Sequence, residues 1–150
     1  MVTFQTTVDS KSGDLEGVRN IVSALERARH LPAEVVFDIN VVLDELISNI
    51  IKYGYNDGAV HEIHVTLSAD AAEVRISIED DGKAFDPSAS PAPDLSLPLE
   101  QRPVGGLGLH FVRKLMDTIE YKREKNRNYM FLKRILSSRS KGVADGSTGS

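Results

Sequence analysis

The sequence contains no cysteine, and that absence removes several classes of site from consideration. Disulfide frameworks, thiolate zinc sites and cysteine nucleophiles are all excluded. No apolar run approaches the roughly 18 residues that a membrane-spanning helix needs, so we expect no membrane span. The N-terminal residues also lack a basic start followed by an apolar stretch, so we see no secretory signal and expect a cytoplasmic protein.

Charge is unevenly distributed along the 150 residues, whose formal net charge is −4. Residues 1–112 carry 8 basic and 18 acidic side chains, whereas residues 113–150 carry 10 basic and 4 acidic ones. A basic segment of this kind can bind nucleic acid or an acidic protein partner, or it can form only a solvated strand face. Because aromatic residues are not interleaved with these bases, we do not favour nucleic-acid binding.

Hydrophobic periodicity divides the chain into strands and helices. Alternating apolar residues predict strands, whereas apolar residues at every third or fourth position predict helices. In chain order the pattern predicts a strand at 2–8, helices at about 15–28 and 33–53, strands at 63–67 and 74–78, a helix that follows the glycines at 105–108 and runs to about 118, and a hairpin of strands at 119–123 and 129–136. The last turn is placed at residues 126–128.

This order of elements predicts an α+β fold. Runs of adjacent strands favour a mostly antiparallel or mixed sheet with helices on one face, which is a two-layer sandwich. Residues 86–104 lose all periodicity and hold five of the six prolines, as expected for a lid or binding loop. Residues 137–150 are small and polar, so we expect a disordered tail there.

The helix expected over 33–53 carries a polar stripe in an apolar body. Spacings of seven, four and three place four polar residues on one side of a helix, namely Asp38, Glu45, Asn49 and Lys52. Buried carboxylates and amides are costly unless they are paired or face a wet cavity. The stripe therefore either faces solvent or places Glu45 and Asn49 one turn apart in a polar pocket.

Two glycine-containing segments add to this pattern. Asp80 and Gly82 close an alternating strand, and no partner strand follows within a few residues, so the carboxylate and the glycine suit a nucleotide base. An ordinary hairpin turn is the alternative. The glycines at 105–108 precede a helix, where free backbone N–H groups and the helix dipole suit an anion, although a plain hinge would use the same residues.

Taken in order, these segments resemble the GHKL ATP-binding fold, and most closely the small anti-sigma factor serine/threonine kinases of bacteria. The resembling motifs are DELISNIIKYGY at 44–55, EDDGKAFDP at 79–87 and GGLGLHFVRKLMD at 105–117. The similarity extends over residues 2–136 and implies a histidine-kinase-like ATP-binding domain at 1–136. It also implies a Bergerat-type sandwich with an ATP lid.

The resemblance implies a role for each matching residue. Glu45 matches the general base that takes a proton from the hydroxyl of a protein substrate. Asn49 matches the ligand of the Mg²⁺ ion that bridges the ATP phosphates, and Asp80 matches the group that binds the adenine amino group. The implied nucleotide-binding set is Asn49, Lys52, Asp80, Gly82, Ala84, Gly105, Gly106, Leu107 and Gly108. Lys52 is a candidate phosphate-facing cation that could equally lie in solvent.

The function implied by the resemblance is an ATP-dependent serine/threonine protein kinase that phosphorylates a small antagonist protein and regulates a sigma factor. ATP, ADP and Mg²⁺ are the implied ligands, and a homodimer through the first strand or first helix is the implied assembly. The sequence departs from the pattern at Ala84, where many relatives have a second glycine, and it lacks a late Gly-Thr-Thr-like motif. The alternative is a nucleotide-binding switch that sequesters a partner with little or no kinase activity.

Overall fold

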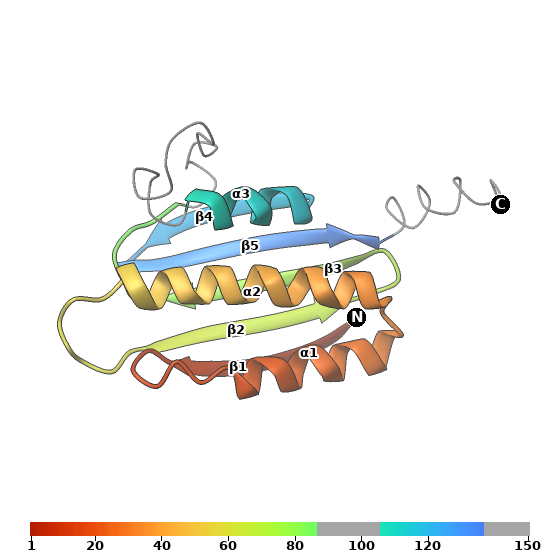
Figure 1. Ribbon diagram of the computed structural model, residues 1–150, viewed down its shortest axis with the longest axis horizontal. Coiled ribbons are helices and arrows are strands. Elements are labelled where there is room, and N and C mark those ends of the chain that lie inside the picture. Colours follow the sequence, from red (N-terminus) through yellow and green to blue (C-terminus); the bar gives the residue numbers. More distant parts are fainter. Residues whose placement is uncertain (87–105, 137–150) are drawn as a thin grey trace.

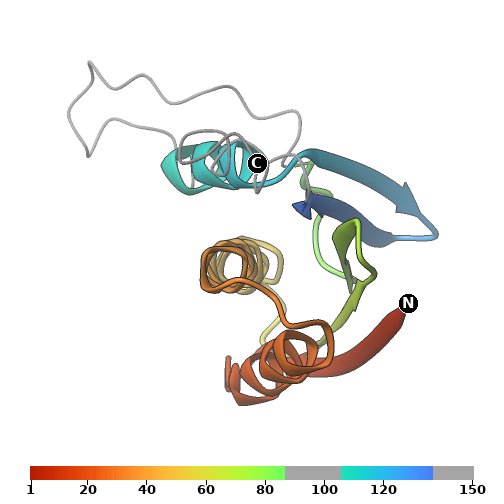
Figure 2. The same cartoon turned by 90° about the vertical axis from the view of Figure 1, so that its right-hand side faces the viewer.

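Within residues 1–86 and 106–136, which the computed structural model describes, five strands form one sheet with three helices on one of its faces (Figures 1 and 2). The elements in chain order are β1 (Val2–Asp9), α1 (Glu16–Arg29), α2 (Ala33–Tyr53), β2 (Glu62–Ala69), β3 (Glu73–Asp80), α3 (Gly106–Leu115), β4 (Thr118–Glu124) and β5 (Arg127–Ile135). The strand order is β1-β2-β3-β5-β4, and every neighbouring pair is antiparallel. The α+β two-layer architecture expected from the sequence is confirmed.

The hydrophobic core lies between the helices and the inner face of the sheet. Alternation directs every second residue of β2 and β3 into this layer, and helical spacing does the same for a wide face of α2. The fully buried members from these three elements include Ile39, Leu43, Leu46, Ile47, Ile63, Val65, Leu67, Val74, Ile76 and Ile78. Burial of each such side chain contributes about 1.5–3 kcal/mol, so α2, which lies between α1 and α3 (Figure 1), is held firmly against the sheet.

The third helix differs in both bounds from the sequence prediction. It begins at Gly106 and ends at Leu115, so residues 106–108 form its first turn instead of preceding it, and its end falls short of residue 118. The backbone N–H of Asp117 already donates to the carbonyl of Lys133 on β5. The chain has therefore turned toward the sheet before another helical turn can form.

The last hairpin also differs from the prediction, in the position of its turn. Lys125 and Asn126 have φ angles of 52° and 63°, and two consecutive left-handed residues are typical of a type I′ hairpin turn. β5 begins at Arg127, so Asn128 belongs to the strand, where it lies opposite Arg123 of β4. Asn128 is a buried strand residue and not a turn residue.

The polar stripe of α2 is divided between two environments. At the N-terminal half of the helix, Asp38 accepts hydrogen bonds from Nε and Nη2 of Arg134 on β5, at 3.2 and 3.0 Å. Both residues are buried, so this part of the stripe pairs with the sheet instead of facing solvent. The ion pair joins α2 to β5 at the end of the molecule opposite Asn49.

Several predictions concern residues that the structure does not describe. The lid expected at 86–104 is described only at its first residue, and the disordered tail expected at 137–150 lies wholly outside the described ranges, as does Gly105. Among the described helices, none has the length and apolar character needed to cross a membrane.

Candidate functional site

The end of α2, the end of β3 and the start of α3 lie at the same end of the molecule (Figure 1). The backbone N–H of Lys83 donates to the carbonyl of Gly54 at 2.9 Å, which ties the segment after β3 to the segment after α2. A Cβ atom at Gly82 would lie 2.9 Å from the carbonyl oxygen of Gly54 and 3.1 Å from its Cα. Because these are backbone atoms, position 82 accepts only glycine without local rearrangement.

Asp80 is the last residue of β3 and has an exposed fraction of only 2%. Its Oδ2 atom accepts hydrogen bonds from the backbone N–H of Gly82 at 2.8 Å and from the side-chain amide of Asn128 at 3.1 Å. Its Oδ1 atom is buried and has no hydrogen-bond partner among the described residues. A buried acceptor without a partner costs about 1–3 kcal/mol, so this atom is suited to a ligand that donates a hydrogen bond.

Burial raises the pKa of Asp80, because a carboxylate is less stable away from water. The hydrogen bonds from Gly82 and Asn128 lower this pKa, as does the positive charge of Arg123, whereas the charge of Asp81 raises it. The net direction is upward. Two donors and one cation therefore oppose the desolvation of this carboxylate, and each of them favours its acceptor form.

Asn128 connects Asp80 to the hairpin of β4 and β5. Its amide nitrogen donates to Asp80, to the carbonyl of Lys83 at 2.8 Å and to that of Gly82 at 3.3 Å. Its amide oxygen accepts hydrogen bonds from the hydroxyl of Tyr121 and from the guanidinium of Arg123, the latter at 2.9 Å. Arg123 also donates to the carbonyl of Gly82 at 2.7 Å. The turn after β3 is therefore bonded to Gly54 on one side and to Asn128 and Arg123 of the β4–β5 hairpin on the other.

A stacked pair of rings borders this turn. The rings of Tyr55 and His61 lie 4.2 Å apart and nearly parallel, at 10°. Nε2 of His61 lies 2.9 Å from Asp57, and its Nδ1 lies 3.1 Å from Asp81, the neighbour of Asp80. The pKa of Tyr55 is raised by burial and further by the charges of Asp80 and Asp81, so its hydroxyl stays protonated.

Glu45 and Asn49 are brought together on α2, as the helical spacing predicts. Asn49 is buried, Glu45 is half-buried, and the amide nitrogen of Asn49 donates to Oε2 of Glu45 at 2.6 Å. Asp44, the neighbour of Glu45, points elsewhere and pairs with Arg19 of α1. The bond to Glu45 uses the amide nitrogen of Asn49 and leaves the amide oxygen as a possible ligand.

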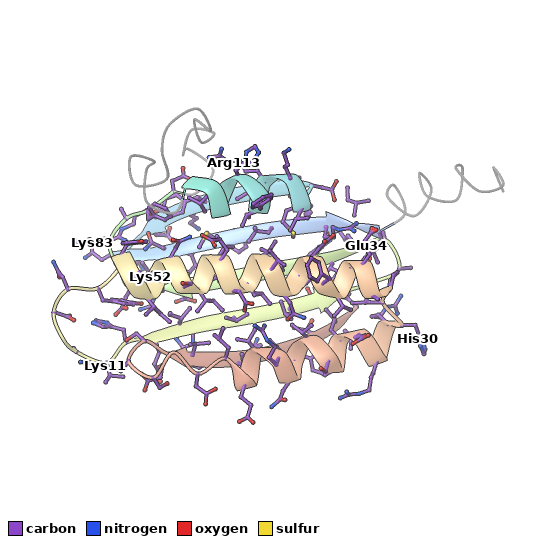
Figure 3. The ribbon with its side chains drawn as sticks, viewed as in Figure 1. Lys11, His30, Glu34, Lys52, Lys83 and Arg113 are labelled. Carbon is purple, nitrogen blue, oxygen red and sulfur yellow. The ribbon has the colours of Figure 1, made fainter. Side chains whose placement is uncertain are left out.

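The remaining predicted residues have less defined positions. Lys52 is exposed on the last turn of α2, and Figure 3 shows it at the same end of the molecule as Lys83. Ala84 is exposed, two residues after Gly82. Gly106, Leu107 and Gly108 have a described backbone in the first turn of α3.

The residues of the β4–β5 hairpin that contact Asp80 or its neighbours are not predicted from the sequence as site residues. Asn128 was assigned to the turn, although the alternation of Asn128, Met130, Leu132 and Arg134 would have placed it on the inward face of a strand. Tyr121 and Arg123 alternate on one face of β4, and Arg123 lies opposite Asn128, but neither residue belongs to a sequence motif.

Comparison with known families and sequences identifies clear relatives. Residues 8–133 match the family described as the histidine kinase-like ATPase domain. The serine/threonine-protein kinase BtrW of Bordetella bronchiseptica is 32% identical over 100 residues, which cover 67% of this chain and 70% of that protein. The serine-protein kinase RsbW of Halalkalibacterium halodurans is 30% identical over 126 residues, which cover 81% of this chain and 76% of that protein.

Solved structures with the same arrangement of elements are more distant in sequence. The structure of the RsbU and RsbW domains of Rv1364c from Mycobacterium tuberculosis has a TM-score of 0.56 at 16% identity, covering 90% of this chain and 32% of that one. A blue-light-activated histidine kinase, EL346 of Erythrobacter litoralis, also has a TM-score of 0.56 at 16% identity, covering 83% of this chain and 42% of that one. This chain thus spans less than half of either structure, and the likeness concerns the fold alone.

Proposed function

Because this chain belongs to the histidine kinase-like ATPase domain family, we propose that it binds ATP beside Asp80 and transfers the terminal phosphoryl group to a serine or threonine of another protein. We assign residues 1–136 to this ATP-binding domain. The observation that carries the proposal is the buried Oδ1 atom of Asp80, an acceptor without a partner among the described residues. An adenine amino group supplies the donor that this atom lacks.

The glycines around Asp80 support a nucleotide at this position. Gly82 allows the turn after β3 to approach Gly54 closely, and the backbone N–H of Gly82 in this turn donates to Oδ2 of the Asp80 carboxylate. Ala84 follows on the exposed side of the same turn. We assign Gly106, Leu107 and Gly108 to the phosphates, because backbone N–H groups in the first turn of a helix have no helical partner and attract anions. Gly105 precedes them in the same motif and is assigned with them on the resemblance alone.

Asn49 is the residue that we assign to Mg²⁺. Its amide oxygen, which has no hydrogen-bond partner among the described residues, is of the ligand type that this ion prefers. Among the described residues, no group of three or more His, Cys, Asp or Glu side chains could hold a metal. This fits an ion held by one side chain together with substrate phosphates and water. When bound, Mg²⁺ neutralises charge on the phosphates, and we assign Lys52 to the same role.

Glu45 is assigned as the general base. The hydrogen bond from Asn49 fixes the orientation of this carboxylate one helical turn from the proposed metal ligand. In the proposed reaction, the hydroxyl oxygen of the substrate forms a bond to the terminal phosphorus and the bond from that phosphorus to the leaving ADP oxygen breaks. The hydroxyl proton passes to Glu45. The protein contributes mainly positioning and charge compensation, as phosphoryl transfer requires.

We propose a small anti-sigma factor antagonist as the protein substrate and a sigma factor as the regulated partner. The support is the resemblance of the motifs together with the relatives named BtrW and RsbW, which are serine/threonine- and serine-protein kinases. We also propose a homodimer through β1. This strand lies at the edge of the sheet, and three of its four outward side chains, Thr3, Gln5 and Thr7, are uncharged, so charge repulsion between two such strands is confined to Asp9 at the end.

The kinase proposal is tested by incubating the purified chain with Mg²⁺, γ-labelled ATP and candidate antagonist proteins. Transfer of label to a serine or threonine, located by mass spectrometry, supports the proposal. Nucleotide-dependent capture of a partner without transfer identifies the alternative, a switch that sequesters its partner. Light scattering with and without nucleotide tests the homodimer.

A further inference from the structure

The orientation of the Asn128 amide is determined by its neighbours. A guanidinium can only donate hydrogen bonds, so the Asn128 atom that faces Arg123 must be the amide oxygen. The opposite side of the amide faces only acceptors, namely the carboxylate of Asp80 and the carbonyls of Gly82 and Lys83. The amide nitrogen therefore lies on that side, and Asn128 acts as a donor to Asp80.

This arrangement gives the two oxygens of Asp80 different roles. Oδ2 receives two N–H groups, from Gly82 and Asn128, so the carboxylate is held in one rotamer. Oδ1 is left as a buried acceptor. A ligand atom at Oδ1 must therefore be a donor, because two acceptors facing each other in a buried site repel and leave both unsatisfied.

We propose that Asn128, oriented by Arg123 and Tyr121, is a positioning residue that holds Asp80 as an acceptor and thereby makes the site select a 6-amino purine over a 6-oxo purine. This inference rests on the proposed function, because it takes the nucleobase to lie at Asp80. Asn128 acts through Asp80 and is not assigned a contact with the nucleotide. The buried side chain of Asn128 accepts hydrogen bonds from Tyr121 and Arg123 of β4. Selection of the nucleobase therefore depends on β4, a strand that carries none of the predicted site residues.

The inference is tested by measuring the affinities of ADP and inosine diphosphate for the full chain and for Asn128→Ala. Inosine diphosphate differs by presenting a 6-oxo acceptor in place of the 6-amino donor. We expect the wild type to prefer ADP by about 10- to 100-fold, as a hydrogen bond to a charged group provides. In Asn128→Ala this ratio should fall to about threefold or less, because Asp80 loses one of the two donors that fix its rotamer.

Arg123→Ala provides a second variant in case Asn128→Ala does not fold. It removes the donors to the Asn128 oxygen and to the carbonyl of Gly82, so the ratio should fall in the same direction. Arg127→Ala is the matched control, since Arg127 lies on the same hairpin but pairs with Glu79. In Arg127→Ala the ratio of the affinities for ADP and inosine diphosphate should equal that of the wild type. Thermal unfolding of each variant reports whether it is folded.

In Asp80→Asn we expect the preference between ADP and inosine diphosphate to reverse, which a purely structural role of Asp80 would not produce. The donors at Gly82 and Asn128 would hold the new amide oxygen, so its NH₂ group would occupy the Oδ1 position and favour the 6-oxo purine. A decrease of both affinities in Asn128→Ala and Arg123→Ala with an unchanged ratio would overturn the inference and leave the proposed function standing. Failure of the wild type to bind ADP would overturn both.

Discussion

Asn49 donates a hydrogen bond of 2.6 Å to Glu45, one turn earlier on the same helix. The bond joins an amide whose oxygen has no hydrogen-bond partner among the described residues to the carboxylate that we assign as the general base. Both side chains lie in the C-terminal half of α2, the half that leads to Gly54 and thus to the turn after β3. The two proposed roles, metal ligand and general base, are therefore coupled by one contact.

Substitution of Glu45 should separate chemistry from binding. In Glu45→Ala we expect phosphoryl transfer to fall by about 100-fold or more, the range that a general base contributes. The affinity for ADP should change by less than about threefold, because Glu45 is not assigned to the nucleotide. Single-turnover transfer assays and calorimetric titration measure the two quantities.

Asp44→Ala is the control for this substitution. Asp44 is the neighbour of Glu45 but pairs with Arg19 on α1, so its removal should leave transfer unchanged. If Glu45→Ala transfers phosphate at the wild-type rate, the assignment of the base is wrong.

The buried ion pair of Asp38 and Arg134 should be important for stability. Removal of Asp38 leaves the buried guanidinium of Arg134 with only the exposed carboxylate of Glu34, 3.9 Å away, as a partner charge, and breaking such a buried pair costs about 3–5 kcal/mol. We expect Asp38→Ala to lower the free energy of unfolding in urea by that amount, whereas Asp44→Ala, which breaks the half-exposed pair with Arg19, should cost about 1 kcal/mol or less. Equal losses in the two variants would contradict the account.

Gly82→Ala should damage the site more than the fold. The new Cβ would meet the carbonyl of Gly54 and Oδ2 of Asp80, both at 2.9 Å, so the turn after β3 must shift. We expect at least about a tenfold loss of ADP affinity, on the order of 1.4 kcal/mol. Gly58→Ala, at a left-handed residue with open space around it, should lose stability through backbone strain and keep its ADP affinity. Wild-type affinity in Gly82→Ala would refute this explanation.

His61 should make stability depend on pH in the neutral range. The hydrogen bond to Asp57 raises the pKa of His61 above its usual value, burial opposes this in part, and Asp81 adds a further increase. Because the folded-state pKa is the higher one, this stabilisation is fully present below about pH 6.5 and is lost as the pH rises through the raised value. Urea unfolding at several pH values should show this decline in the wild type and a flatter profile in His61→Gln. Parallel profiles would contradict it.

The sequence predicted the elements with strong periodicity almost without error. α2 runs from Ala33 to Tyr53 as expected, because Pro32 marks its start and its apolar face is continuous. The contact between Glu45 and Asn49 followed from their spacing alone. Elements whose bounds depend on tertiary contacts were less accurate, as at the end of α3, where the backbone of Asp117 bonds to β5.

The parts of the site that come from distant strands were not predictable in the same way. Asn128 lies 48 residues from Asp80, and nothing local indicates that their side chains meet. Its assignment to the turn followed from the preference of Asn for turns, which competes with the inward alternation of β5. Likewise, Asp38 gave no sequence signal of its partner, because Arg134 lies 96 residues away.

Calorimetric titration with ADP, with and without Mg²⁺, tests the central claim that an adenine nucleotide binds at Asp80 and Asn49. We predict binding in the wild type that Mg²⁺ strengthens. Asp80→Asn should weaken it by about 10-fold or more, because the acceptor facing the base becomes a donor. In Asn49→Ala the effect of Mg²⁺ should disappear. No binding of ADP to the wild type, or wild-type affinity in Asp80→Asn, would contradict the claim.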